Sequence, residues 1–412
     1  MALTKAVASA VPRERRFFST VSSREWTWIK HSILARYMRP WSRKVGVSAK
    51  RIWVVDCFAG AGGYEDAATG ERRDGSPVLA AMEALRYKRD RPTREMRVIC
   101  VERNPDNFRD LRRRVAGFGD VVTCFEGDFV KHLPAVRDMI GTEPALVMLD
   151  PIGLKAIGAD ACRGLLERRG KTDLFVIVDF SIVHRTRGML DGDGRPTSTR
   201  RSAPALAANI DSFYAGSGNW RDVPLALPVE ERERAYLRLY FDEVLLDSFE
   251  YVGSLPVRKA VSANPEYWIV HAASHIDAHL LMNDEIVRID EELYRRTYAG
   301  SFPELVDQMY ERKRTDRHAA LKHDMVVFIR RGGPRGVTVK LLVENMLSRH
   351  YGFAKVSRWS GDYGRLIREL ITEREVRREK PSVRARLEPT ERLTAIPKDR
   401  TVAVTVDKEE RA

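Results

Sequence analysis

Unbroken apolar runs in the first half of the chain predict a parallel β-sheet. Strand-like runs lie at 52–57, 97–102, 121–126, 145–150 and 173–180. Helical patterns separate them at 77–87, 105–115, 129–140 and 159–168. Because these strands are continuous Val, Ile and Leu runs that do not alternate with polar residues, helices should cover both faces of the sheet. The alternation of strand and helix predicts an α/β fold with a doubly wound, mostly parallel sheet of Rossmann type.

Segments on either side of this alternation complete the predicted core. Apolar residues recur at helical spacing over 23–41, which predicts an amphipathic helix against the sheet. Lys30 and His31 within it lie either on a solvated face or close enough to reach a crevice. The Gly-, Pro- and Ser-rich stretch 191–211 predicts a mobile loop, with a helix over 230–246 after it. Strands at 254–263 and 266–273 should then form a hairpin that closes the sheet in antiparallel orientation.

The pattern changes after Pro303. Helices are predicted over 301–317, 337–350 and 363–373, with a short strand pair over 376–386. Small helices followed by a basic β element predict a small α+β module of winged-helix type. We therefore expect three parts, which are a flexible tail at 1–22, an α/β core at 23–300 and a C-terminal module at 301–412.

Composition narrows the class of protein. The chain has 412 residues and a net charge of +13, with 43% apolar and 31% charged residues, as is typical of a globular protein. From Ser301 onward there are 25 Lys and Arg against 17 Asp and Glu. Either a polyanionic partner such as nucleic acid or a solvated, Arg-rich surface explains this excess. No apolar run approaches the ~20 residues of a membrane span, so a cytoplasmic protein is expected.

The sequence does not indicate a metal site. His271 and His275 are four residues apart, but no H-E-x-x-H motif or third ligand accompanies them, so a structural role is favoured. The four cysteines contain no C-x-x-C pair and lie at Cys57, Cys100, Cys124 and Cys162.

The segment 51–63, RIWVVDCFAGAGG, gives the strongest indication of a ligand site. An apolar strand ends in Asp56, and Phe58, Gly60 and Gly62 follow it. A strand, an acid and close-set glycines open a nucleotide-sized crevice in doubly wound folds, because glycine lets the backbone approach a ligand.

The loop that follows is long enough to cover a ligand, and Tyr64 lies near its mouth. It ends where Ser76 is expected to be the N-cap of a helix and Pro77 its first residue. This assignment explains Ser76 and Pro77 without any ligand.

Acids end the next two strands. Glu102 can accept both hydroxyls of an adenosine ribose, and the long first loop explains its wide spacing from the glycines. Asp128 can either meet an adenine amino group or cap the helix that starts at Phe129. With the segment LDPIG at 149–153, these residues predict a class I methyltransferase-like core. The expected ligand is S-adenosylmethionine, bound by Asp56, Phe58, Gly60, Gly62, Glu102 and Asp128.

Asp150 and Pro151 are the candidates for the reaction itself. In methyltransferases that act on amino groups, an Asp/Asn-Pro-Pro-aromatic turn at this point holds the target nitrogen, so that catalysis is mostly positioning. This chain lacks the second proline and the aromatic residue, so a plain strand-ending turn is the alternative. The missing ring would have to come from Tyr64 or Phe180. Further candidate substrate contacts are Asp179 and Lys30.

Four motifs resemble the three-Cys-motif partner family, whose members are methyltransferase-like and are often found beside a radical S-adenosylmethionine protein. The motifs are WTWIKHSILARYM, VVDCFAGAGGY followed by DGSPVLA, LDPIGLKAI, and YWIVHAASHIDAHLLMNDEI. Members more commonly have Gly-Pro-Gly at positions 60–62 and Asp-Pro-Phe-Gly at 150–153. The resemblance covers about residues 23–300.

Two functions of different classes follow from these observations. The first is an S-adenosylmethionine-dependent methyltransferase that acts on a nitrogen of a nucleic-acid base, with the basic module binding the backbone. The second is a non-catalytic, cofactor-binding scaffold for a radical S-adenosylmethionine partner protein, which the missing aromatic residue favours. An enzyme that processes another adenine nucleotide is less favoured because the chain has no P-loop lysine motif.

Overall fold

The computed structural model places most of the chain, and it divides the chain into two compact units at 1–301 and 302–412. Each unit is described by itself. The described residues are 25–65, 70, 72–151, 153–159, 164–165, 168–191, 202–258, 263–298, 302–357, 361–379 and 387–396.

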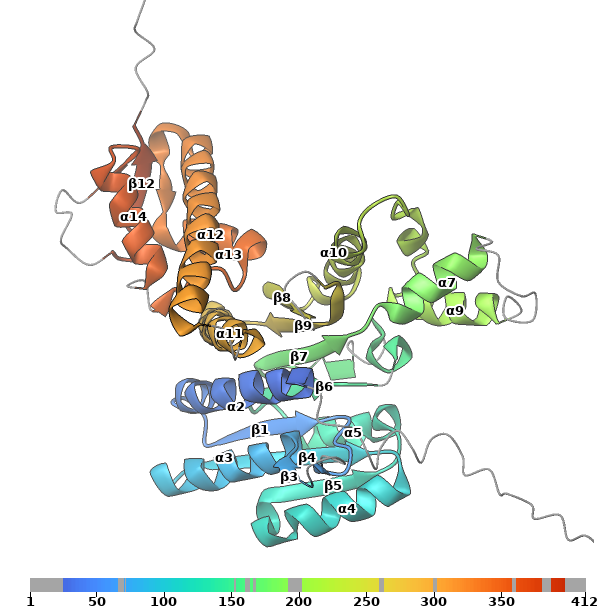
Figure 1. Ribbon diagram of the computed structural model, residues 1–412. Helices are drawn as coiled ribbons and strands as arrows, with labels where there is room; N and C mark the ends of the chain where they lie inside the picture. Colours follow the sequence, from blue (N-terminus) through green and yellow to red (C-terminus); the bar gives the residue numbers. More distant parts are fainter. Residues whose placement is uncertain are drawn as a thin grey trace, which may run out of the picture. The chain divides into compact units, whose positions relative to one another are not determined.

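A seven-stranded sheet forms the centre of the first unit (Figure 1). Its strands are β1 (Arg51–Asp56), β4 (Glu95–Glu102), β5 (Val122–Glu126), β6 (Ala145–Leu149), β7 (Thr172–Val178), β8 (Tyr251–Arg258) and β9 (Pro265–Ala273). Their order is β5-β4-β1-β6-β7-β9-β8. The first five are parallel, whereas β9 is antiparallel to both β7 and β8.

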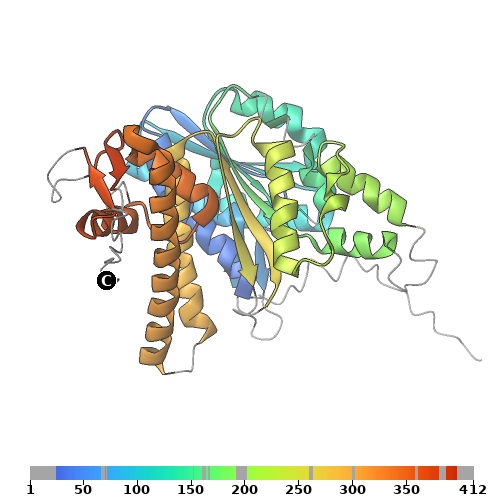
Figure 2. The same cartoon turned by 90° about the horizontal axis from the view of Figure 1, so that it is seen from above.

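This arrangement is the class I methyltransferase-like, Rossmann-type fold. The strand order reverses direction at β1, and one antiparallel strand is inserted next to the last strand. The predicted α/β fold with a mostly parallel sheet is therefore confirmed, and so is the antiparallel hairpin that closes it. Figure 2 shows this hairpin beside the rest of the sheet.

Helices cover both faces of the sheet. Side chains from α5 (Phe129–Ile140), α7 (Ser181–Leu190), α9 (Ala203–Phe213) and α10 (Val229–Tyr240) join one face in a continuous apolar core. Helix α2 (Glu25–Val45) packs against α3 (Ser76–Asp90) and α11 (Ile276–Thr297). Helix α4 (Pro105–Val115) contacts α3 and the neighbouring strands β4 and β5.

Helix α2 confirms the amphipathic helix that the sequence predicts at the N-terminal end of the core. Its apolar positions Ile29, Ile33, Leu34, Tyr37 and Met38 are each at most 3% exposed. Burial of such a stripe is the main source of stability for a helix of this kind. The packing of this helix brings Lys30 and His31 close to the loops that follow β6 and β1.

Two expected loops contain regular structure. Within 191–211, residues from Ala203 onward form α9, because Ala203, Ala207, Ile210 and Phe213 recur at helical spacing and are buried. The expectation of a mobile loop is wrong for this part, and 192–201 lie outside the described residues. The loop after β1 contains a hairpin of β2 (Gly63–Glu65) and β3 (Arg72–Asp74). The helix predicted over 159–168 lies partly outside the described residues.

The second unit contains three helices and a small antiparallel sheet. The helices are α12 (Pro303–Arg331), α13 (Val339–His350) and α14 (Asp362–Thr372), and the strands are β10 (Val337–Thr338), β11 (Val376–Arg378) and β12 (Arg392–Ala395). The sheet order is β10-β12-β11. A buried ion pair ties β11 to the segment before β12, because Arg378 Nε lies 2.6 Å from Glu391 Oε1.

Two boundaries in this unit differ from the predicted ones. Helix α12 continues beyond Arg317 to Arg331, because Leu321, Met325 and Ile329 extend its buried face. Charged residues around position 317 interrupt the apolar pattern there, so the sequence predicts an earlier end. The strand that pairs with β11 lies at Arg392–Ala395, and residues 380–386 of the predicted pair lie outside the described residues.

Candidate active site

The carboxyl ends of β1, β4 and β6 meet at one edge of the sheet, where the strand order changes direction. In doubly wound folds, ligands bind in the crevice outside such an edge. Asp56 ends β1, Glu102 ends β4, and Asp150 follows β6 directly. The structure thus brings three of the predicted site carboxylates to one edge.

Glycine is needed at two positions of the first loop for different structural reasons. Gly60 has φ +59°, and a Cβ built on it would meet no atom of the described residues within 4 Å. Gly62 has φ +75°, and its Cβ would lie 3.1 Å from Leu111 Cδ1. The Gly62 carbonyl accepts a hydrogen bond of 3.0 Å from the amide of Gly75. Gly62 therefore closes the base of the hairpin, whereas Gly60 leaves open space of the kind that a ligand can fill.

Glu102 connects the second strand to this loop. Its Oε2 accepts a hydrogen bond from the Gly60 amide at 2.8 Å, and its Oε1 accepts one from the Asn104 amide at 2.6 Å. The residue is 9% exposed. Each carboxylate oxygen can accept two hydrogen bonds, so Glu102 holds the loop and keeps capacity for donors from a ligand.

Asp56 is a buried acid with one oxygen unsatisfied. It is 1% exposed, its Oδ1 accepts a hydrogen bond from the Phe58 amide at 3.2 Å, and its Oδ2 has no partner among the described residues. Burial raises the pKa of Asp56 to about 6, although hydrogen bonds from Ser76 and Phe58 oppose the shift. A buried acceptor without a donor is costly, and a ligand donor at this position would remove that cost.

The start of α3 differs from the sequence-based expectation. Gly75, and not Ser76, is the N-cap residue, and no side chain caps the helix. Ser76 instead lies near Asp56 and lowers the pKa of that acid. The predicted helix start is correct, but its serine supports the site acid.

Asp128 caps α5, since its side chain accepts a hydrogen bond from the Val130 amide at 2.9 Å. Phe58 packs against Phe129 of the same helix, with ring centroids 6.1 Å apart. One of the two roles weighed for Asp128 is therefore observed. A contact with adenine stays a prediction.

Lys30 forms an ion pair with Asp150 across 120 residues of sequence. Their side chains are 18% and 35% exposed. Burial disfavours the charged form of Lys30, but the Asp150 carboxylate outweighs this effect and raises the pKa of Lys30 above its usual value. Lys30 is therefore an ammonium that binds Asp150 Oδ2, and Asp150 has no other hydrogen-bond partner among the described residues.

The next residue of α2 contacts the first loop. His31 Nε2 lies 3.1 Å from the Tyr64 hydroxyl, and the two rings stack with centroids 5.3 Å apart. Burial lowers the pKa of His31 to about 3 and raises the pKa of Tyr64 to about 12, so both groups are neutral at physiological pH. Adjacent residues of α2 thus contact both loops of the site.

Tyr267 joins this group and is not found by the sequence reasoning. Its neighbour Trp268 pairs with Val178, the last residue of β7, so Tyr267 lies just beyond that strand end. Burial raises the pKa of Tyr267 well above its usual range, and the nearby Asp150 and Tyr64 add to the effect. The sequence predicts a strand over EYWIVHAA, but sheet register is needed to place its second residue at this edge.

The candidates after β7 have local roles. Asp179 is exposed and accepts hydrogen bonds from the amide and the hydroxyl of Ser181, at 2.8 and 3.1 Å. Phe180 is 1% exposed and packs against Tyr236, with ring centroids 5.5 Å apart. The ring of Phe180 is therefore part of the apolar core. Of the two aromatic candidates, Tyr64 is the one that lies at the site.

The two histidines of the IVHAASHID segment, His271 and His275, have different surroundings. His271 is fully buried and stacks on His279 at 5.9 Å between ring centroids, whereas the side chain of His275 is 54% exposed. Among the described residues, no group of three His, Cys, Asp or Glu side chains is placed to hold a metal ion. No helix in the same part of the chain is long and apolar enough to cross a lipid bilayer.

No protein-family model matches the sequence, and no curated protein matches it. Matching solved structures include protein LPL1258 from Legionella pneumophila str. Philadelphia 1, at 12% identity over 62% of this chain and 86% of that one, with a TM-score of 0.36. The O-methyltransferase TomG from Streptomyces achromogenes, solved with SAM, is 15% identical over 60% of this chain and 80% of that one (TM-score 0.28). An O-methyltransferase from Bacillus cereus, solved with SAH, is 11% identical over 62% and 83% (TM-score 0.28). These values are too low to carry a conclusion about the activity or the ligand of this chain.

Proposed function

We propose that the protein is an S-adenosylmethionine-dependent methyltransferase. The observation that carries the proposal is the contact between Glu102 and the Gly60 amide at the switch point of a class I methyltransferase-like sheet. This contact places a carboxylate with spare acceptor capacity beside a glycine whose Cβ position is open. A ribose with two vicinal hydroxyls fits that combination of acceptor oxygens and space.

The residues around this contact suit the rest of the cofactor. Asp56 Oδ2 needs a donor, and the amino group of the methionine part supplies one. Asp128 lies at the end of β5, where an adenine amino group can reach its remaining lone pairs. When bound, the cofactor supplies an electrophilic methyl group on a sulfonium. The chain itself orients, desolvates and holds the two reactants.

We infer that the acceptor is a nitrogen, held by Asp150 beside Pro151. Lys30 binds Oδ2 of Asp150, so Oδ1 remains to accept a hydrogen from an amino group. Such a hydrogen bond fixes the direction of the nitrogen lone pair. Tyr64 and Tyr267 border the same place and are suited to stack on a planar acceptor such as a nucleic-acid base.

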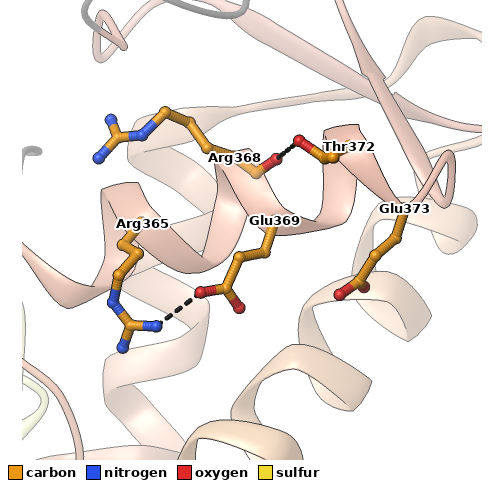
Figure 3. Close-up of a pocket in the computed structure, with 5 residues that line it drawn as sticks. All are labelled: Arg365, Arg368, Glu369, Thr372 and Glu373. Carbon is orange, nitrogen blue, oxygen red and sulfur yellow. Dashed lines mark hydrogen bonds and ion pairs between the residues drawn. The ribbon is translucent and has the colours of Figure 1, made fainter.

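We propose that the C-terminal unit is a winged-helix module that contacts nucleic acid. Its order of helix, strand, two helices and two strands supports this assignment. The charge on its α14 surface is mixed, however. Figure 3 shows Arg365, Arg368 and Thr372 along a pocket that Glu369 and Glu373 also line. Lys322 lies 2.6 Å from Glu373, so part of this charge is neutralised within the unit.

Calorimetric titration and a turnover assay together test the proposed function. S-adenosylmethionine and S-adenosylhomocysteine should both bind, and labelled methyl groups should appear on total RNA or on denatured genomic DNA. Binding of both compounds without transfer to RNA, DNA or protein would contradict catalysis and favour the cofactor-binding scaffold for a radical S-adenosylmethionine partner. Failure of both compounds to bind would contradict the assignment of the site.

A further inference from the structure

A histidine–glutamate pair lies at the same edge of the sheet but outside the site described above. His184 is in the first turn of α7, and its Nε2 lies 3.0 Å from Glu233 Oε1 on α10. Glu233 is 5% exposed, and its Oε2 accepts a hydrogen bond from Trp268 Nε1 at 2.8 Å. Both oxygens of this buried carboxylate are thus engaged, which fixes its orientation and that of the imidazole.

Sheet register places the pair near the half of the edge that β6 and β7 form, which we call the acceptor half because Asp150 follows β6. The pair lies on the face of the sheet that α7 and α10 cover. Trp268 pairs with Val178, the last residue of β7, and β7 is the neighbour of β6, whose end carries Asp150. Helix α7 continues from the end of β7, as Figure 1 shows. The predicted cofactor contacts on β1, β4 and β5 lie on the other half of the sheet.

The hydrogen bond to Glu233 determines which ring nitrogen of His184 is available. A carboxylate accepts, so Nε2 carries the proton and donates it, and the lone pair of the neutral imidazole is on Nδ1. The His184 side chain is 23% exposed, and Nδ1 has no partner among the described residues. A base whose second nitrogen is oriented by a buried carboxylate is the arrangement that activates histidine in hydrolytic triads.

Two arginines lie near the pair, Arg187 on the next turn of α7 and Arg232 on α10. Both arginines lie within electrostatic reach of Tyr236, whose ring meets His184 edge-on at 5.7 Å between centroids. Arg187 is in turn 3.3 Å from Asp191, which offsets part of its charge.

We propose that His184 is the proton acceptor of the methyl transfer and that Glu233 is its positioning residue. This inference rests on the proposed function. The lone pair of the acceptor nitrogen forms the new N–C bond while the S–C bond breaks and its electron pair stays on sulfur. The proton that the nitrogen then loses passes to Nδ1 of His184, and the resulting imidazolium is stabilised by Glu233. The products are the methylated acceptor, S-adenosylhomocysteine and one proton, which His184 releases to solvent.

Nitrogen-15 NMR of the histidine rings in the full chain tests the pair without any acceptor. The chain has nine histidines, and the resonances lost in His184→Gln identify this one. We expect the neutral ring to carry its proton on Nε2, and Nδ1 to gain a proton on acidification. In Glu233→Gln, the neutral ring should no longer be held in that one tautomer, because the amide that replaces the carboxylate can donate as well as accept. A neutral wild-type ring protonated on Nδ1, or a tautomer that Glu233→Gln leaves unchanged, would overturn the inference.

Turnover on total RNA or denatured DNA supplies the second test. His184→Gln should lower kcat about 100-fold or more, the usual contribution of a general base, while the affinity for S-adenosylhomocysteine stays the same. His275→Gln, at an exposed histidine outside the site, is the matched control and should keep wild-type kcat. An unchanged kcat in His184→Gln would overturn the inference. Absence of turnover in the wild-type chain would contradict the proposed function instead, and the NMR result would still decide whether the pair has the required tautomer.

Discussion

At the scale of single residues, Gly60 distinguishes a ligand role from a structural one. We expect Gly60→Ala to lower the affinity for S-adenosylmethionine at least about tenfold, because its new Cβ enters the open space beside Glu102. The positive φ of +59° should also cost about 1–2 kcal/mol of stability in any residue with a side chain. Titration calorimetry and chemical unfolding measure the two effects separately.

Gly119 provides the matched control for this variant. It has φ +62°, and a Cβ there would also meet no atom within 4 Å, but it lies before β5 and outside the site. Gly119→Ala should therefore lose comparable stability and keep its affinity for the cofactor. Equal losses of affinity in both variants would mean that Gly60 acts only through the stability of the fold.

The ion pair between Lys30 and Asp150 gives a second prediction. Asp150→Asn should lower the free energy of unfolding by about 1–3 kcal/mol, because it leaves a half-buried ammonium without its counter-charge. Lys30→Met added to Asp150→Asn should recover part of that loss, because it removes the unpaired ammonium. The affinity of each variant for S-adenosylhomocysteine should stay within about threefold of wild type, because neither residue is among the predicted cofactor contacts. Urea unfolding of the two single variants and the double variant measures the coupling. Additive losses would show that the two side chains do not interact in solution.

Local sequence predicts the acids at strand ends better than their partners. Asp56 and Glu102 were found because each ends an apolar run, and the end of a buried parallel strand fixes the edge where its acid lies. The partnership of Lys30 with Asp150 depends on how α2 packs across the sheet, which no local pattern contains. Phe180 was misplaced for a related reason, since an apolar residue after a strand has the same pattern whether it faces the core or a ligand.

At the scale of elements, α2 is attached to the sheet through a buried acid. Trp41 Nε1 donates to Asp173 Oδ2 at 2.5 Å, and Tyr37 donates to the same oxygen at 3.4 Å. Asp173 is at the start of β7 and is 6% exposed. Burial raises its pKa to about 7, although the two hydrogen bonds oppose the shift. Ionisation of this acid strengthens the two hydrogen bonds but leaves a charge buried beneath α2, so the free energy of unfolding should fall when Asp173 ionises.

The pH dependence of stability tests this attachment. An unfolded aspartate titrates near pH ~3.9, so between about pH 4 and 7 the folded chain keeps a proton on Asp173 that the unfolded chain has lost. This contribution to the free energy of unfolding thus falls as pH rises through that window, on the order of 2–4 kcal/mol in total. Relative to wild type, Asp173→Asn should gain stability from pH 5 to pH 8. Asp247→Asn, at an exposed position, should show no such trend. A constant difference between Asp173→Asn and wild type would contradict the raised pKa.

Element boundaries were predicted well where the periodicity is strong and poorly where polar residues interrupt it. The five parallel strands and the helices between β1 and β6 match the patterns because each is an unbroken or cleanly periodic run. Helix α9 was missed because it follows a run of Gly, Pro, Ser and Arg, and small alanines form its buried face. Helix α11 was not predicted either, although the buried residues Met282, Ile286 and Ile289 recur along it. The buried face of α9 is therefore identified by its packing, whereas the helical spacing of Met282, Ile286 and Ile289 is a local pattern that predicts α11.

At the scale of the whole molecule, the proposed chemistry and the basic charge lie in different units. The carboxylates of the site and the His184–Glu233 pair belong to the first unit, whereas the predicted polyanion contact belongs to the second. Binding of a nucleic acid to the second unit should weaken as the salt concentration rises. The mixed charges along α14 make that salt dependence smaller than the excess of basic residues alone suggests.

The division into two units predicts two unfolding transitions in the calorimetry of the full chain. S-adenosylhomocysteine at one hundred times its dissociation constant should stabilise only the first unit, by about 2.7 kcal/mol, because it binds the folded form of that unit alone. Arg378→Met should lower only the other transition, by about 3–5 kcal/mol, because it leaves Glu391 as an unpaired buried charge. The ligand and the substitution thus assign the transitions independently. A single transition that both of them shift would mean that the units unfold as one cooperative body, and that a ligand at the sheet edge also stabilises the basic module.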